Sequence, residues 1–282
     1  MSICEGDFVT SPAMPQWGLG KVLEILEGLK IRIFFENAAE KLMLSDRVEI
    51  APKPERHFVL DQVDRTRTVK GFRPVPDLEK AFLGLHSGGF LGESYLTKER
   101  EYKVKASAFF QEQLGRQAFE ALLAAGQYEE ICKTALRVIS KTNLIFPQES
   151  MALRDGLKRG DEQKQQFARA LFEQLYGTGT DQQRFECFTQ TLTELDACKW
   201  TIATYFPYMS DPSHHIFVKP TITVKAAEAF AFDIAYNAHP NWRTYDRVRQ
   251  FVAFVSAELS KREVLVPQDL IDVQSFIWCS QQ

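Results

Sequence analysis

A short polar segment holds the most suggestive group of chemically active side chains in the chain. Asp211, His214 and His215 are residue types that bind divalent metals. Adjacent histidines on an extended segment point to opposite faces, so further ligands such as His239 or Cys198 would have to converge there. The alternative is a polar turn that precedes a strand. The sequence favours the turn, and it keeps a metal-dependent enzyme around these residues as one alternative function.

Two carboxylates near the C-terminus raise the question of acid–base chemistry. Asp269 and Asp272 are three residues apart and share one face of a predicted helix. Asp269 lies in the first turn, where a negative charge complements the helix dipole. Asp272 has apolar neighbours, and a buried carboxylate needs a partner. We interpret it as half of a structural ion pair, for which the sequence offers three cations: Lys219, Arg154 and Arg243.

The remaining reactive side chains form no recognisable catalytic motif. The five cysteines are scattered and form no CxxC pair, which argues against a disulfide framework or a zinc ribbon. No Walker A sequence, nucleophile elbow, Rossmann glycine fingerprint or HExxH motif is present. The sequence therefore predicts no catalytic residue, no metal site and no cofactor, and it favours a protein that is not an enzyme.

The composition is that of an ordinary globular protein. The 282 residues are 45% hydrophobic and 25% charged, with a net charge of -3. This charge gives no reason to expect strong nonspecific binding to nucleic acids. No apolar run approaches the ~18 residues of a membrane span, and the N-terminus lacks the pattern of a secretory signal. We expect a reduced cytoplasmic protein without a membrane partner.

Residues 1–54 are predicted to contain about five short strands. They are expected at residues 7–10, 21–26, 30–35, 41–44 and 48–50, separated by turns rich in glycine and proline. A sheet this small must curl to bury both its apolar face and its edges. The sequence therefore predicts a small, partly open β-barrel, which ends at Pro52 and Pro54 because prolines two apart block a strand.

One corner of this predicted barrel could bind a partner. Gly18 and Gly20 permit the sharp bend that a curled strand entry needs. Trp17 and Phe35 are aromatics that a barrel could expose there, and these four residues are the predicted partner-binding set. The alternative is that alternate aromatics fill the barrel core, which is the interpretation favoured for Phe34.

The charge of this region favours a protein partner. Residues 1–56 carry seven Lys/Arg and nine Asp/Glu, a net charge of -2, whereas a barrel that follows phosphates usually needs a positive surface. The connector, residues 55–92, contains the one basic run worth naming: Arg65, Arg67, Lys70 and Arg73. A solvated linker or an edge strand explains it, and contact with phosphate or with an acidic partner is the alternative.

Residues 93–282 show helical periodicity. Helices are predicted at about 93–114, 116–125, 127–140, 148–158, 161–176, 182–196, 199–206 and 241–261, with a last, mostly apolar helix from residue 267. Residues 216–220 look like a strand. The predicted fold class is α+β, a small barrel followed by a mainly helical domain.

The barrel residues also resemble a known pattern. Gly6-Asp7-x-Val9-x-x-Pro12-x-x-Pro15-x-Trp17-Gly18-x-Gly20-x-Val22, followed by Gly28 and Ile33-Phe34-Phe35-Glu36, resemble a small bacterial domain of the SH3/Tudor-like type. This domain is similar to barrels in UvrD/PcrA-type repair helicases and CarD-type transcription regulators. Because those barrels dock on RNA polymerase, the resemblance implies a protein-binding role.

The rest of the chain resembles uncharacterised bacterial proteins. The resemblance rests on segments such as Met151-Ala152-Leu153-Arg154-Asp155, Asn241-Trp242-x-x-Tyr245 and Ile271-Asp272-Val273-Gln274-Ser275-Phe276-Ile277-Trp278, and it implies no activity. Three hypotheses result. The first is an adaptor whose barrel docks a protein such as RNA polymerase or a helicase. The others are a nucleic-acid-binding protein and the metal-dependent enzyme.

Overall fold

The computed structural model describes residues 3–66, 69 and 71–282. The chain divides into two compact units. The sheet unit is Met1–Ala81 together with Lys225–Phe232, and the helical unit is Phe82–Val224 together with Asp233–Gln282. The fold class is α+β, as predicted.

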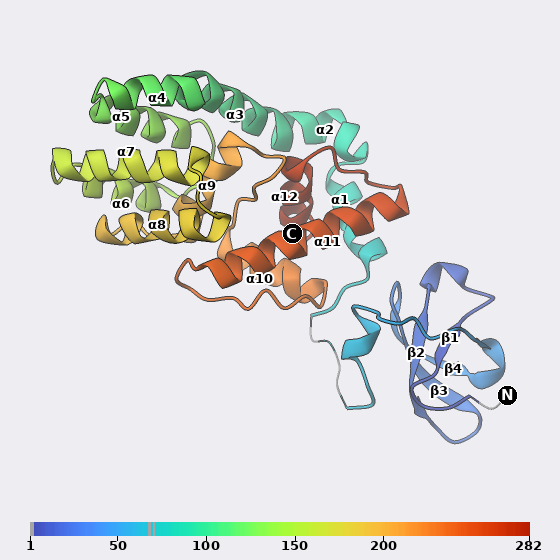
Figure 1. The fold of residues 1–282 in the computed structure, drawn as a ribbon. Coiled ribbons are helices and arrows are strands. Elements are labelled where there is room, and N and C mark those ends of the chain that lie inside the picture. The colour runs from blue at the N-terminus through green and yellow to red at the C-terminus, as the bar shows by residue number, and fades with distance from the viewer. Residues whose placement is uncertain (1–2, 67–68, 70) are drawn as a thin grey trace. The chain divides into compact units, whose positions relative to one another are not determined.

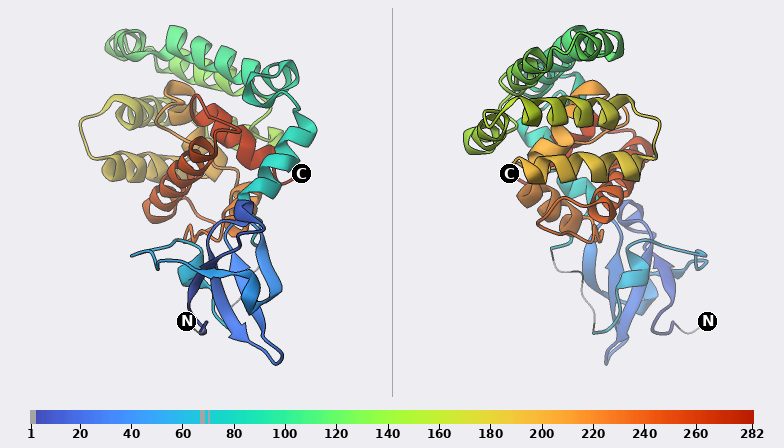
Figure 2. Two further views of the ribbon diagram at one scale, coloured as in Figure 1. Left: turned by 90° about the vertical axis from the view of Figure 1, so that its right-hand side faces the viewer. Right: turned by 60° about the vertical axis from the view of Figure 1, so that its left-hand side comes forward.

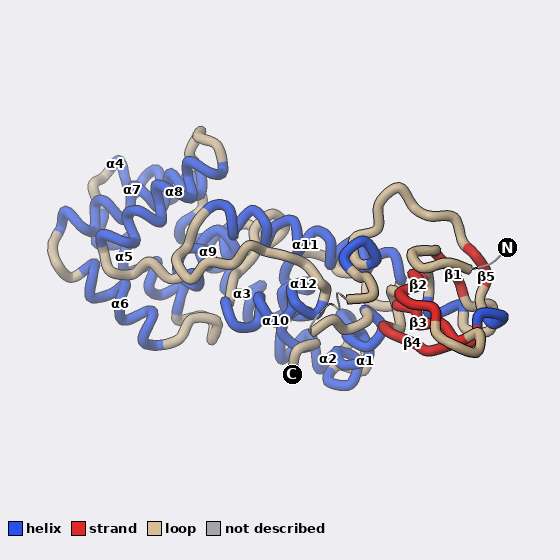
Figure 3. The backbone as a smooth tube through the Cα atoms, turned by 90° about the horizontal axis from the view of Figure 1, so that it is seen from below, coloured by secondary structure: helices blue, strands red, loops and turns tan. Residues whose placement is uncertain are grey.

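The sheet unit is built on five antiparallel strands (Figure 1). Their order across the sheet is β4-β3-β2-β1-β5. The strands are β1 Phe8–Thr10, β2 Gly20–Ile25, β3 Lys30–Phe35, β4 Ala39–Leu44 and β5 Glu49–Ile50. All strands within the described residues lie in this part of the chain, which Figure 3 shows in red. Each predicted strand is found within two residues of its expected bounds.

Both faces of the sheet are buried. Ile33 and Phe35 of β3 pack on one face, in a cluster with Val9, Val22, Ile31 and Val48. Phe34 points to the other face, where it packs with Phe8, Leu23, Val59, Leu60 and Val63. The segment that contains Leu60 and Val63 covers this second face. Lys21 Nζ holds it there by donating to the carbonyl oxygens of Leu60 at 3.1 Å and Val63 at 2.9 Å.

The helices account for most of the remaining chain. They are α1 Val75–Leu85, α2 Glu93–Tyr95, α3 Glu101–Leu114, α4 Arg116–Ala124, α5 Tyr128–Ile139, α6 Pro147–Leu157, α7 Asp161–Tyr176, α8 Asp181–Glu194, α9 Trp200–Ser210, α10 Pro220–Ala229, α11 Trp242–Arg262 and α12 Leu270–Cys279. Successive helices of the helical unit pack side by side, as α7 and α8 do in Figure 2. A π-helical turn, Leu96–Arg100, joins α2 to α3.

Two details of the predicted helical region were wrong. Residues 216–219 form no strand: they have no regular secondary structure, the backbone N–H of Val218 donates to Thr204 Oγ1 at 3.0 Å, and α10 begins at Pro220. Helix α9 does not stop before Pro207 but continues to Ser210. Proline removes one hydrogen bond from a helix. Here the loss is offset by burial, since nearly every residue of α9 is buried.

Helix α12 is a central element of the helical unit. Eight of its residues are buried, including the polar Asp272, Gln274 and Ser275. This confirms the prediction that the last helix is buried centrally, and it places polar chemistry inside the unit. Among the described residues, no helix has the length and apolar character that crossing a membrane requires.

Candidate functional site

The glycine corner of the sheet is shaped by close packing. A Cβ atom on Gly20 would lie 2.7 Å from the ring of Phe35, and Gly18 has a φ of +72°, which favours glycine. Trp17 is partly buried against Phe35, with 5.2 Å between the ring centroids, and Lys41 Nζ lies 5.6 Å from its ring. Phe35 itself is fully buried and is therefore not part of an exposed surface.

Three exposed leucines lie at the open end of the β3–β4 hairpin. Leu29, Leu42 and Leu44 are 71%, 60% and 42% exposed. Leu42 and Leu44 alternate along β4 and so share a face, and the N–H of Ser45 donates to the carbonyl of Leu29. We call these three residues the leucine patch. Strand β4 is an edge strand of the described sheet, because it pairs with β3 alone.

Two residues of the predicted basic run have contacts in the described structure. Arg65 pairs with Glu24 at 2.9 Å, and Arg67 and Lys70 lie outside the described residues. The backbone N–H of Arg73 donates to the carbonyl of Ala229 at 2.8 Å. Because two of its four cations lie outside the described residues, contact between this run and phosphate stays a prediction.

The segment around Asp211 does not bring its three side chains together. His214 is exposed and bonds Asp211 Oδ2 through Nδ1 at 2.7 Å. His215 turns inward, where burial lowers its pKa to about 4, and its Nδ1 has no hydrogen-bond partner in the described structure. Within the described residues these three form no group that could hold a metal ion.

Asp272 is a buried carboxylate on α12, as the sequence indicated, but its cationic partner is none of the three that we expected. Asp272 is fully buried and accepts from Arg100 Nη1 at 2.6 Å and from Tyr95 OH at 2.5 Å. Asp269 caps α12 and binds the same guanidinium at 2.7 Å. Hydrogen bonding to Asp269 raises the pKa of Arg100, and burial raises that of Tyr95. The ion pair is confirmed, and the cation expected among Lys219, Arg154 and Arg243 was wrong.

A second polar network lies beside the first. Lys103 is fully buried, and its ammonium donates to Glu99 at 3.2 Å and to Ser275 at 2.8 Å. Burial lowers the pKa of this lysine. His86, Glu99 and Cys279 could converge on a metal ion. Each already has a protein partner, however: His86 Nε2 lies 3.7 Å from Cys279 Sγ, and Glu99 binds Lys103.

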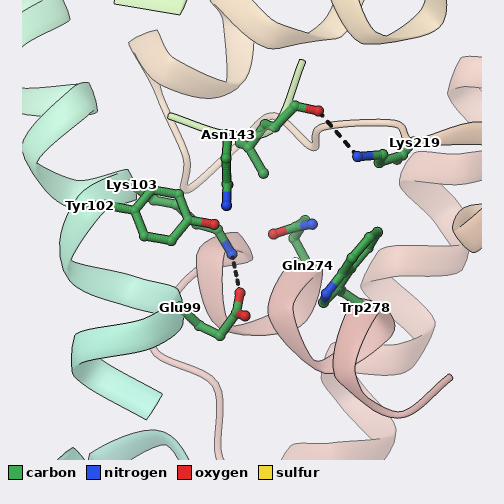
Figure 4. A pocket seen from close by; sticks show the side chains of 8 residues that line it. Glu99, Tyr102, Lys103, Asn143, Lys219, Gln274 and Trp278 are labelled. Carbon is green, nitrogen blue, oxygen red and sulfur yellow. Dashed lines mark hydrogen bonds and ion pairs between the residues drawn. The ribbon is translucent and has the colours of Figure 1, made fainter. Parts of the chain in front are cut away.

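Next to this network the helical unit contains a small pocket of about 80 Å³ (Figure 4). It is lined by Glu99, Tyr102, Lys103, Asn143, Leu144, Lys219, Gln274 and Trp278. These residues come from the π-helical turn, α3, α12 and two loops, so the fold assembles the pocket from segments far apart in the sequence.

Sequence reasoning missed this pocket. In the sequence, Lys219 stands out only as a possible cation for Asp272, and nothing marks Gln274 as a pocket residue. The one available signal was a run of polar residues, Asp272, Gln274 and Ser275, within an otherwise apolar helix, since buried polar groups need partners.

Comparison with known proteins assigns a family model to the sheet alone. Residues 3–52 match a family described as "Protein of unknown function (DUF3553)". No curated protein matches the chain. No solved structure matches it either.

Proposed function

We propose that the sheet unit is an SH3/Tudor-like module that docks a protein partner, and that the protein acts as a non-enzymatic adaptor. The observation that carries this proposal is the edge strand β4 with the leucine patch on one of its faces. An edge strand offers unpaired backbone N–H and C=O groups, and natural proteins usually protect such edges with charges or a covering segment. Here two of the three most exposed residues of β4 are leucines.

The partner that fits this edge is an extended segment of another protein. Such a segment can add to β4 as a further strand, so that main-chain hydrogen bonds give affinity and alternate side chains give specificity. Leu42 and Leu44 would pack against the apolar side chains of the added strand. On the other face, Trp17 and Lys41 lie next to the same edge. The predicted Trp17 corner and the leucine patch thus flank one docking edge.

The resemblance to barrels of UvrD/PcrA-type helicases and CarD-type regulators directs the proposal toward RNA polymerase. The net charge of -2 over residues 1–56 supports a protein rather than a nucleic-acid partner. The ion pair between Arg65 and Glu24 supports the same choice, since it occupies a cation that a phosphate would need.

The proposal is tested with purified core RNA polymerase and the full-length protein. We expect binding that the double substitution Leu42→Asp and Leu44→Asp weakens at least about tenfold, because charges at a desolvated strand-addition site are costly. Leu91→Asp is the matched control, since Leu91 is 76% exposed and lies in the helical unit. Unchanged binding by the double variant would contradict the β4 edge as the contact. Absence of binding to polymerase by the wild-type protein would contradict the assignment of the partner.

A further inference from the structure

The pocket of the helical unit contains a buried hydrogen-bond acceptor with no partner. Gln274 is 5% exposed, and its Oε1 accepts no hydrogen bond from the described residues. Figure 4 shows the amide of Gln274 pointing into the space bordered by Lys103, Asn143 and Trp278. Leaving a buried acceptor unsatisfied is costly, so native proteins rarely keep one unless a ligand or water supplies the donor.

One cation at the same pocket, Lys219, makes only a weak hydrogen bond. Lys219 Nζ makes a long hydrogen bond of 3.4 Å to the carbonyl of Leu144. The ammonium lies 4.2 Å from the ring centroid of Phe146 and 5.1 Å from that of Trp278. The described residues form no ion pair with it, and Glu149 acts on it only at longer range: burial lowers the pKa of Lys219, and the charge of Glu149 opposes that shift. Two aromatic faces hold the ammonium in place and leave it able to bind an anion.

The other cation of the pocket already has an ion-pair partner and a hydrogen-bond partner. Lys103 is paired with Glu99 and bonded to Ser275, so it contributes no unmatched charge. The pocket therefore offers one available positive charge, from Lys219, and one available buried acceptor, from Gln274. The amide of Asn143 borders the same space from the α5–α6 loop (Figure 4).

The size of the pocket limits what it can hold. A volume of about 80 Å³ is room for on the order of five to eight waters, or a ligand with a similar number of heavy atoms. A separate cavity that shares Lys219, Gln274 and Trp278 with the pocket is lined by apolar side chains, but its volume is only about 10 Å³. A ligand with a bulky apolar tail does not fit.

From these observations we infer that the helical unit binds a small carboxylate that carries a hydroxyl or amino group. The carboxylate pairs with Lys219, and the O–H or N–H of the ligand donates to Gln274 Oε1. This binding site is independent of the docking edge on the sheet unit, and it requires no chemistry on the ligand.

The experiment is a calorimetric titration of the full-length protein with L-lactate and L-alanine. Two analogues each lack one group of the ligand: propionate lacks the hydroxyl or amino donor, and L-lactamide lacks the negative charge of the carboxylate. We expect saturable binding of L-lactate or L-alanine that is at least about tenfold tighter than that of either analogue. If neither compound binds saturably at millimolar concentration, or if propionate or inorganic phosphate binds equally well, the inference is overturned.

Variants locate the site. Lys219→Met and Gln274→Met should each weaken binding at least about tenfold, because each removes one of the two polar contacts. The matched control is Lys141→Met, since Lys141 Nζ also lies over an aromatic ring, 4.6 Å from the centroid of Phe109, but does not line the pocket. The ligand-free Gln274→Met variant should melt at an equal or higher temperature than the wild type, which separates lost binding from lost folding. Full binding by both pocket variants would overturn the inference.

Discussion

Arg100 and Asp272 form an ion pair across 172 residues of sequence, with 2.6 Å between Nη1 and Oδ1. The arginine lies at the end of a π-helical turn, and the aspartate lies in the first turn of α12. The pair thereby fixes α12, which supplies Gln274 and Trp278 to the pocket, against the turn that supplies Glu99.

Removing one member of this pair should be strongly destabilising. Arg100→Met leaves the fully buried Asp272 without its cation, which costs about 3–5 kcal/mol in the free energy of unfolding. Lys105→Met is the control, because it breaks an exposed pair with Glu101 and should cost less than about 1 kcal/mol. Urea denaturation measures both. Equal losses in the two variants would contradict the importance of the buried pair.

His215 should make the protein less stable in acid. Burial holds its folded-state pKa at about 4, below the ordinary value of 6.5, so the unfolded chain binds a proton that the folded protein does not. Stability is therefore lost as pH falls from about 6.5 to about 4, by on the order of 2–3 kcal/mol. His86, whose pKa is also lowered by burial, adds to the effect in the wild type.

The comparison of His215→Gln with His214→Gln isolates this contribution. The first variant should show a smaller loss of stability between neutral and acid pH than the wild type. The second should behave as the wild type does, because the side chain of His214 is 77% exposed. Chemical denaturation over the pH range measures the difference, and parallel curves for wild type and His215→Gln would refute the assignment.

Gly20 should not tolerate a methyl group. In Gly20→Ala the new Cβ would lie 2.7 Å from the ring of Phe35 and 2.8 Å from Ile33, and such overpacking costs about 1–3 kcal/mol. Gly84→Ala is the matched control, because no atom lies within 4 Å of its Cβ position and the residue is in helix α1. That variant should be neutral or stabilised by up to about 1 kcal/mol. Thermal melts decide between these outcomes.

A fragment that ends at residue 54 should fold poorly. It retains Phe8, Leu23 and Phe34 but lacks Val59, Leu60 and Val63, which cover that face of the sheet. We expect it to bind a hydrophobic dye and to give a poorly dispersed amide NMR spectrum. A fragment that ends at residue 74 should bind less dye and give a better dispersed spectrum. A well-dispersed spectrum from the shorter fragment would show that the predicted boundary at 54 is sufficient.

Local patterns in the sequence predicted most of the secondary structure. The alternation in Lys30–Phe35 places β3 at its observed bounds, and the spacing of apolar residues places α11 within one residue. The strand expected at 216–220 was wrong, because apolar β-formers also suit a buried segment without strand pairing, in which the N–H of Val218 donates to a side chain. Burial of Asp272 was predictable from its apolar neighbours.

Long-range partners were not predictable in this way. Nothing near Arg100 in the sequence marks it as the partner of Asp272, because the pairing depends on how α12 packs in the helical unit. The same holds for Lys219 and Gln274, which meet at one pocket only in the folded chain. The exposure of Leu42 and Leu44 also follows from the position of β4 at the sheet edge, which depends on strand order.

Burial of both faces of the sheet has a consequence for folding. Because Ile33, Phe34 and Phe35 are all apolar, a slip of β3 by one residue still places apolar side chains on each face at this end of the strand, and only the first half, where Lys30 and Arg32 flank the buried Ile31, penalises it. The native pairing sets Gly20 opposite Phe35, where a larger residue does not fit. A slip by one residue would bring Leu19 or Lys21 to that position. We therefore expect the Gly20–Phe35 pair to select the strand register, and chains that form it late to pass through mispaired hairpins first.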